Sequence, residues 1–196
     1  MKIVAINGSP RGTDSTSIIM IDALTKYMAD CAIVHITLAD HDLQNCRGCY
    51  SCWINGSGCV IDDDFNKIVA LADGADLIVF ASPVYFKNLT GLLKNFIDRL
   101  TSTGSPHVEK KGESPAFVML SNSGFPYESE FEVISLWIKK FSASMNSTLA
   151  GEFYFPGGKS LKEPTDEAAI YLDNLAQSGR NIVHLLTESA VPRFPC

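Results

Sequence analysis

Residues 2–17 read KIVAINGSPRGTDSTS, and this stretch decides the fold. Its start, residues 2–6, is a short apolar run that predicts a buried strand. The following residues, 7–17, are mostly small or carry hydroxyl groups, and they include a single arginine. They lead into residues 15–28, where apolar side chains recur every three or four positions, as on one face of a helix. A buried strand, a polar loop and a helix in this order form the first unit of an α/β fold.

The same alternation continues along the chain. Further strands are expected at residues 33–38, 75–81, 116–120 and 149–155, and further helices at 64–71, 90–100, 128–141 and 166–186. The strands at 75–81 and 116–120 are nearly continuous apolar runs, which indicates burial on both faces and a parallel sheet. With right-handed crossovers, five such strands give a doubly wound, three-layer α/β sandwich with a five-stranded parallel sheet. Asp64 is the expected N-cap of the helix at 64–71.

The composition is typical of one folded domain. The chain has 196 residues, of which 46% are hydrophobic and 19% charged, and its net charge is −6. It shows no internal repeat or linker, so residues 1–196 are expected to form a single domain. The negative charge argues against nucleic acid and anionic membranes as partners, and no apolar run approaches the roughly 20 residues of a membrane helix. The first strand begins too early for a signal peptide, so a cytoplasmic location is expected.

Ligands of doubly wound sheets bind beyond the carboxyl ends of the strands, which directs attention to the loops after residues 6, 81 and 120. The first of these loops precedes a helix, whose N-terminal N–H groups attract anions. Its hydroxyl groups and its arginine can add donors, so the loop suits a phosphate monoester. Ordinary turn and N-cap chemistry uses the same residue types and stays open as an alternative. The candidate phosphate ligands are Ser9, Arg11, Ser15, Thr16 and Ser17.

The other two loops contain aromatic residues. Residues 82–91 read SPVYFKNLTG, and residues 121–127 read SNSGFPY. Aromatic rings at this edge of a sheet suit a flat, partly apolar ligand, although they could also simply cover the sheet edge. A phosphate loop and two aromatic loops at one edge together meet the needs of FMN, which carries a phosphate and a planar ring system.

The first two loops resemble those of the NAD(P)H-dependent FMN reductases, a family of flavodoxin-like fold. NGSPR with the following Ser15 and Thr16 is similar to the family's phosphate loop, and SPVYF with TGLLKNFIDR is similar to its isoalloxazine loop and following helix. The resemblance covers residues 1–125 with specific motifs. By position, it assigns ring contacts to Pro83, Val84, Tyr85, Phe86 and Asn88, and weaker ring or ribityl contacts to Asn122, Ser123 and Gly124.

The resemblance also implies an activity. NAD(P)H would reduce bound FMN, which would pass electrons to a quinone, a free flavin, an iron–sulfur cluster or another small-molecule or protein acceptor. The chemistry belongs to the cofactor, so no acid–base residue is assigned. Members of the family commonly assemble, and a homo-oligomer, either a dimer or a tetramer, is therefore expected.

A polar connection at about residues 40–62 carries four of the six cysteines, which are Cys46, Cys49, Cys52 and Cys59. The compact C-x2-C-x2-C run is similar to the ferredoxin pattern, although the fourth cysteine follows after six residues and no proline comes next. The segment resembles the iron–sulfur flavoproteins, a branch of the same family with a 4Fe-4S cluster beside FMN. Free or redox-active thiols, and a tetrahedral zinc site, stay open as alternatives.

Two further functions therefore accompany the reductase interpretation. The first is an electron carrier in which the four cysteines hold a cluster, without turnover of a nicotinamide. The second is a thiol-based redox sensor. The remaining cysteines stand apart in the sequence: Cys31 is expected to be a small buried hydrophobic residue, and Cys196 an exposed terminal thiol.

Overall fold

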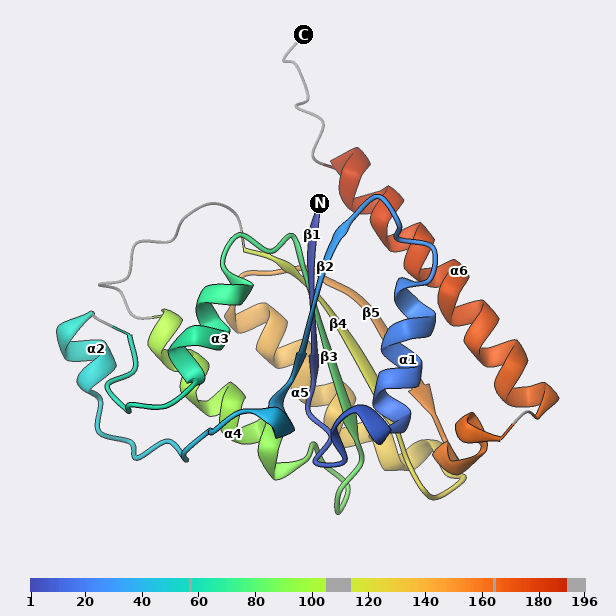
Figure 1. Cartoon of the computed structure of the whole chain (residues 1–196), viewed down its shortest axis with the longest axis horizontal. Coiled ribbons are helices and arrows are strands. Elements are labelled where there is room, and N and C mark those ends of the chain that lie inside the picture. The colour runs from blue at the N-terminus through green and yellow to red at the C-terminus, as the bar shows by residue number, and fades with distance from the viewer. Residues whose placement is uncertain (57, 105–113, 164, 190–196) are drawn as a thin grey trace, which may run out of the picture.

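A computed structural model describes residues 1–56, 58–104, 114–163 and 165–189, so Cys196 lies outside the described residues. Its centre is a five-stranded parallel sheet with the strand order β2-β1-β3-β4-β5 (Figure 1). The strands are β1 (Lys2–Asn7), β2 (Ala32–Thr37), β3 (Leu77–Pro83), β4 (Ala116–Asn122) and β5 (Leu149–Phe155). This is the flavodoxin-like order of doubly wound sheets, and the predicted α/β fold class is confirmed.

Helices cover both faces of the sheet (Figure 1). One face carries α1 (Thr16–Thr25) and α6 (Asp166–Ser189). The other face carries α3 (Phe65–Ala72), α4 (Gly91–Arg99) and α5 (Glu132–Ser144). The short helix α2 (Ser51–Asn55) lies away from the sheet, within the cysteine-rich connection. In the described ranges, no helix combines the length and the apolar character needed to cross a bilayer.

The two apolar layers follow from the alternation of side chains along each strand. In β1, Ile3 and Ala5 pack into the layer under α1 and α6, whereas Val4 and Ile6 pack into the layer under α3, α4 and α5. Successive side chains of a strand point to opposite faces, so a strand buried on both faces needs an uninterrupted apolar run. Cys31 is partly buried and packs against the first of these layers.

The structure corrects some predicted boundaries. β3 and β4 end two residues later than predicted, because Pro83 is still in register with Asn122. Asp64 holds the N-cap position of α3, as predicted, but its side chain makes no capping hydrogen bond, and its Oδ2 accepts from the Asp42 N–H at 3.0 Å. Its neighbour Asp63 accepts from the Phe65 N–H at 3.1 Å instead. The acidic residues at the end of the polar connection thus hydrogen-bond the backbone at its start and at the beginning of α3.

Two glycines allow elements to approach closely. A Cβ at Gly179 of α6 would stand 2.0 Å from the Leu24 carbonyl oxygen of α1, so only glycine fits between these helices. A Cβ at Gly8 would stand 2.5 Å from the Leu93 Cβ. The Gly8 carbonyl also accepts a hydrogen bond from the Thr90 hydroxyl at 2.6 Å. The loop after β1 is therefore fixed against the start of α4, at the carboxyl edge of the sheet.

Candidate functional site

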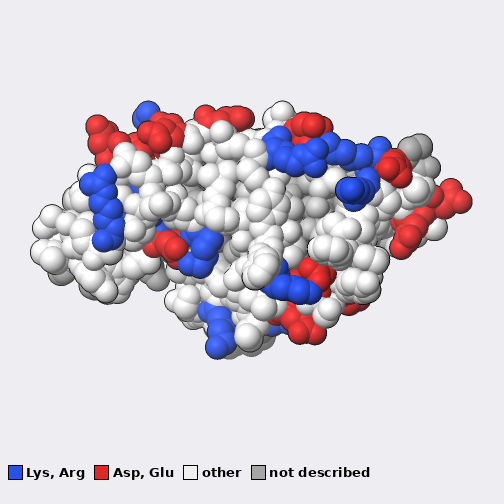
Figure 2. Space-filling view, turned by 90° about the horizontal axis from the view of Figure 1, so that it is seen from below, with Lys and Arg blue, Asp and Glu red and all other residues white. Residues whose placement is uncertain are grey.

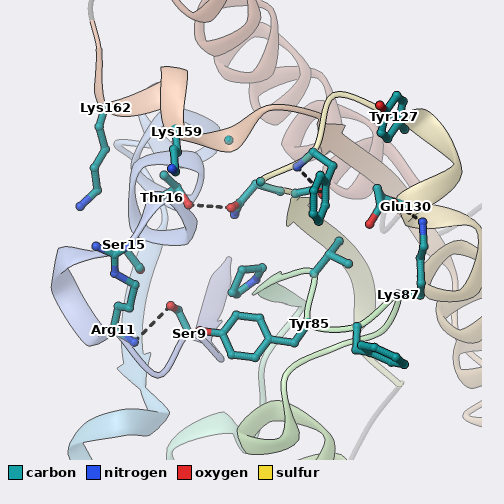
Figure 3. A pocket seen from close by; sticks show the side chains of 18 of the residues that line it. Ser9, Arg11, Ser15, Thr16, Tyr85, Lys87, Tyr127, Glu130, Lys159 and Lys162 are labelled. Atoms are coloured by element: carbon teal, nitrogen blue, oxygen red, sulfur yellow. Dashed lines mark hydrogen bonds and ion pairs between the residues drawn. The ribbon is translucent and has the colours of Figure 1, made fainter.

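The loops that follow β1, β3, β4 and β5 line one cavity of about 1050 Å³ at the carboxyl edge of the sheet (Figure 3). Most of the predicted site residues line it, although they lie far apart in the sequence. These are Ser9, Arg11, Ser15, Thr16, Pro83, Val84, Tyr85, Phe86, Asn122, Ser123 and Gly124. The structure does not bring the side chains of Ser17 and Asn88 to the cavity wall.

The loop after β1 is organised by a residue that the sequence analysis did not single out. The Asn7 side chain is buried, and its Oδ1 accepts a hydrogen bond from the Ser9 N–H at 3.0 Å. Its Nδ2 donates to the Gly12 carbonyl at 2.9 Å. The Ser15 hydroxyl caps α1 by accepting from the Ile18 N–H at 3.4 Å, and it also lines the cavity. Ser15 thus both caps α1 and lines the cavity.

Asn122 joins the end of β4 to the start of α1. Its Oδ1 accepts a hydrogen bond from the Thr16 hydroxyl at 2.6 Å, and its Nδ2 donates to the Ser17 hydroxyl at 3.4 Å. Ser17 is buried, so it supports Asn122 from behind. These bonds span more than 100 residues of chain and fix two walls of the cavity relative to each other.

The loop after β3 makes a tight turn at the cavity rim. Tyr85 and Asn88 exchange backbone hydrogen bonds of 2.8 and 3.1 Å across the turn. The two residues between them, Phe86 and Lys87, both have positive φ values, of 49° and 67°. This geometry is that of a two-residue primed turn, which non-glycine residues adopt at a cost in strain. It leaves the Phe86 ring fully exposed, and the Asn88 side chain accepts a hydrogen bond from the Leu89 N–H.

The cavity has a polar end and an aromatic end. In Figure 3, Arg11, Lys159 and Lys162 lie on the side of Ser15 and Thr16. The Tyr127 ring lies on the other side, the Tyr85 ring lies between the two sides next to Ser9, and Phe125 adds a further exposed ring to the cavity lining. Figure 2 shows this end of the molecule with its basic side chains unevenly spread over a largely uncharged surface. Such a division suits a ligand with an anionic group and a flat ring.

Several charged residues of the cavity were not predicted. Lys87 forms an ion pair with Glu130, whose side chain is only 6% exposed. Lys162 donates to the Asp14 carboxylate at 2.6 Å, and this hydrogen bond lowers the pKa of Asp14. Lys159 and Lys162 belong to the short helix η5 (Gly158–Lys162), which follows β5. The sequence carries a signal for them, because residues 157–160 read GGKS shortly after a predicted strand, at the edge of the sheet where ligands bind.

The four clustered cysteines do not converge. All four are free thiols; Cys46 and Cys49 are exposed, and Cys52 and Cys59 are partly buried. Across the described part of the chain, no three cysteine, histidine or acidic side chains are grouped so that they could hold a metal ion. The Ser51 hydroxyl hydrogen-bonds the Cys49 thiolate and lowers the pKa of that thiol. The spacing of the four cysteines therefore predicted a set of metal ligands, but the structure does not bring these cysteines together.

The base of the cysteine-rich connection is held by a buried ion pair. Arg99 of α4 and Asp63 have side chains that are 1% and 0% exposed, and Arg99 Nη2 donates to Asp63 Oδ1 at 2.8 Å. Asp63 Oδ2 accepts from the Gln44 N–H at 2.8 Å, and the Cys59 Sγ lies 3.3 Å from Arg99 Nη2. Burial raises the pKa of Asp63, but hydrogen bonds from Arg99, the Gln44 N–H and the Phe65 N–H outweigh burial and hold that pKa below its ordinary value.

Comparisons by sequence match about half to two thirds of this chain. A family model described as NADPH-dependent FMN reductase matches residues 1–125. An iron–sulfur flavoprotein of Archaeoglobus fulgidus is 33% identical over 132 residues, which are 65% of this chain and 64% of that protein. An iron–sulfur flavoprotein of Methanocaldococcus jannaschii is 37% identical over 100 residues, 50% of this chain and 51% of that protein. The chain thus spans about half to two thirds of the length of these relatives.

Solved structures share the fold over nearly the whole chain. The apo form of an NADH:FMN oxidoreductase is 21% identical, with a TM-score of 0.64, and the match covers 98% of this chain and 91% of that one. An NAD(P)H:quinone oxidoreductase from Methanothermobacter marburgensis is 16% identical, with a TM-score of 0.68, over 94% of this chain and 98% of that one. At such identities the likeness establishes the flavodoxin-like fold and nothing finer.

Proposed function

Since this chain belongs to the NADPH-dependent FMN reductase family, we propose that it is an oxidoreductase that binds FMN and takes its electrons from NAD(P)H. The observation that carries the proposal is the divided cavity, with hydroxyl and cationic groups at one end and aromatic rings at the other. FMN has a phosphate monoester at one end and a flat, partly apolar ring system at the other. We further propose that residues 1–196 act as a single FMN-binding domain.

The polar end is the proposed phosphate site. Ser9, Ser15 and Thr16 surround the start of α1, where backbone N–H groups and the helix dipole favour an anion. Arg11 adds a full positive charge on the same side. Ser17 and Asn88 are assigned supporting places, behind Asn122 and within the turn after β3, because neither lines the cavity.

The other end is the proposed ring site. Pro83, Val84 and Tyr85 line the cavity from the end of β3 and the loop after it, and Ser123 and Gly124 line it from the loop after β4, beside the exposed Phe125. The Val84 N–H donates to the Asn122 carbonyl at 2.8 Å, so the two loops are fixed relative to each other. These residues would bind and orient the ring and exclude water from one of its faces.

When bound, FMN supplies the hydride and electron transfer, and the chain supplies binding, orientation and electrostatics. The cavity lies at the upper end of the size range of small-molecule sites, about 300–1,000 Å³. Its volume of about 1050 Å³ supports room for the nicotinamide or for an acceptor next to the ring. A quinone, a flavin or another small molecule would fit this access.

Anaerobic stopped-flow mixing tests the reductase proposal. FMN-loaded protein is mixed with NADPH and, separately, with NADH, and the flavin absorbance is followed. We expect the flavin absorbance to bleach after mixing with NADPH, with NADH or with both, and to recover when a quinone is added. Protein that keeps its oxidised flavin spectrum at saturating concentrations of both nicotinamides would contradict the proposal.

A second candidate is an iron–sulfur flavoprotein that carries electrons. It is supported by the four clustered thiols and by relatives named iron–sulfur flavoproteins. The donor set has suitable chemistry, but its arrangement does not fit, because the described residues form no metal-binding group. Binding of a cluster would require the connection to rearrange around its tip.

Iron and acid-labile sulfide assays on anaerobically purified protein test this second candidate. About four of each per chain would support it, as for a 4Fe-4S cluster held by four thiolates. Protein that contains neither, and that gains neither on anaerobic reconstitution, would exclude it. The redox-sensor hypothesis is then tested by counting free thiols before and after mild oxidation, because a sensor that forms disulfides loses free thiols in pairs.

A further inference from the structure

The loop after β5 brings two lysines to the polar end of the cavity. Lys159 and Lys162 both line the cavity, together with Arg11, Ser15 and Thr16 (Figure 3). They lie beyond residues 1–125, the region matched by the family model. No family motif therefore assigns them a role, and their place has to be explained from their contacts.

The start of η5 is fixed in position against the loop after β4. The Gly158 N–H donates to the Ser123 carbonyl, and the Gly157 N–H donates to the Phe125 carbonyl at 2.9 Å. A Cβ at Gly158 would stand 2.9 Å from Asn122 Oδ1, so the backbone itself packs against the Asn122 side chain. The backbone that precedes Lys159 is thus held at the cavity wall, and its side chain starts from a defined place.

Lys162 is already engaged with a partner. Its ammonium donates to the Asp14 carbonyl at 2.9 Å and to the Asp14 carboxylate at 2.6 Å. This contact joins η5 to η1 (Gly12–Asp14), which follows β1. The Asp14 carboxylate, whose side chain is exposed, offsets part of the charge of Lys162, and the contact holds the two loops together.

Lys159 and Arg11 are different, since neither side chain has a hydrogen bond or ion pair among the described residues, although the Arg11 charge acts on the nearby Asp14 carboxylate and Glu163 also lines the cavity. In Figure 3, Ser15 and Thr16 lie between these two cations. Arg11, Lys159 and Lys162 outnumber the nearby acidic residues Asp14 and Glu163, so this end of the cavity favours a positive potential although the chain as a whole carries a charge of −6. Such a potential selects anions at this end of the cavity.

We propose that Lys159 is a specificity-determining residue that binds a phosphate monoester together with Arg11, from the opposite side of Ser15 and Thr16. A monoester carries about −1.5 to −2 charges at neutral pH. The N-terminus of α1 offers about +0.5 and Arg11 one full charge, so a dianion keeps about half a negative charge that these two groups do not offset. Lys159 supplies a positive charge that offsets it. The inference rests on the proposed function, because FMN is the expected bearer of the phosphate.

Flavin binding by the Lys159→Gln variant tests the proposal. Dissociation constants of FMN and riboflavin are measured with the flavin-free protein by fluorescence titration. We expect the variant to bind FMN about tenfold more weakly or worse, as for the loss of one charge-assisted hydrogen bond. Riboflavin lacks the phosphate, so its affinity should not change. Lys159→Arg should restore most of the preference for FMN.

Lys140→Gln on α5 is the matched control, because it removes the same charge from an exposed side chain that does not line the cavity. Its FMN-to-riboflavin ratio should equal that of the unmodified chain. Lys159 is itself exposed, so neither substitution should lower the melting temperature, and a folding defect can be recognised by that measurement.

NADPH carries a phosphate monoester too, and a second arm separates the two sources. The preference for NADPH over NADH is compared between the variant and the unmodified chain. A loss of this preference with an unchanged FMN-to-riboflavin ratio would assign Lys159 to the nicotinamide phosphate and still support a monoester site. The inference is overturned if the unmodified chain binds FMN and Lys159→Gln changes neither the FMN-to-riboflavin affinity ratio nor the preference for NADPH over NADH. In that case the proposed function stands. If the unmodified chain binds no flavin, the proposed function fails first.

Discussion

The cavity and the cysteine-rich connection are built in contrasting ways. The cavity walls come from four strand ends and are joined by hydrogen bonds between distant residues, such as Thr16 with Asn122 and Gly8 with Thr90. The connection is held mainly at its base by Asp63 and Arg99, while its outer helix α2 exposes apolar side chains. The sheet thus fixes the geometry of the proposed flavin site, whereas the connection can carry different thiol chemistry without disturbing that site.

The largest expected effect is on stability, at the base of the connection. Asp63→Asn leaves the Arg99 charge buried without its partner, which typically costs about 3–5 kcal/mol in the free energy of unfolding. Urea denaturation measures this loss. Asp98→Asn is the control, because its ion pair with Lys94 is exposed and worth only about 0.3–0.5 kcal/mol. A loss below 1 kcal/mol for Asp63→Asn would mean that the base is not anchored by this pair.

The same carboxylate makes stability depend on pH. The folded-state pKa of Asp63 is depressed, so its stabilisation is fully present above the unfolded-state pKa, about 3.9, and is lost as the pH falls through the folded-state value. We expect the free energy of unfolding to decrease on acidification below about pH 4. Urea titrations between neutral pH and strong acid should show a shallower decrease for Asp63→Asn. Parallel curves for the two proteins would contradict this assignment.

The next effect belongs to the cavity. Asn122→Ala removes the partner of the Thr16 and Ser17 hydroxyls, so we expect a loss of about 1–2 kcal/mol in the free energy of unfolding. FMN affinity should fall about tenfold, because the wall between β4 and α1 loses its shape. Asn66→Ala is the comparison, since the Asn66 amide donates to the Cys59 carbonyl in the other region. It should leave FMN affinity unchanged, and equal losses for both variants would break the distinction between the regions.

The smallest effect is expected at the tip of the connection. Cys46 and Cys49 are exposed, so replacing both with serine should change the free energy of unfolding by no more than about 0.5 kcal/mol. FMN affinity, measured by the same titration, should stay within experimental error. A clear loss of FMN binding by this double variant would show that the connection takes part in the flavin site.

The sequence predicted the strands, and it predicted which loops lie at the carboxyl edge of the sheet. Apolar runs of the right length indicated the strands, and the rule that ligands bind at carboxyl edges located the first three loops. It could not predict which hydroxyl faces the cavity: Ser17 and Ser15 are two residues apart, yet one supports Asn122 and the other lines the wall. Asp63 and Asp64 are adjacent, and only the distant Arg99 decides which of them is buried. Cysteine spacing likewise leaves the path of a long connection undefined.

The most direct test is the binding of FMN to flavin-free protein, followed by equilibrium dialysis and by the melting temperature. The account predicts saturation at one FMN per chain, a rise in melting temperature with FMN, and a weaker FMN affinity for Arg11→Gln without a change for riboflavin. A protein that retains no FMN on dialysis and melts at the same temperature with and without excess FMN would contradict the central claim.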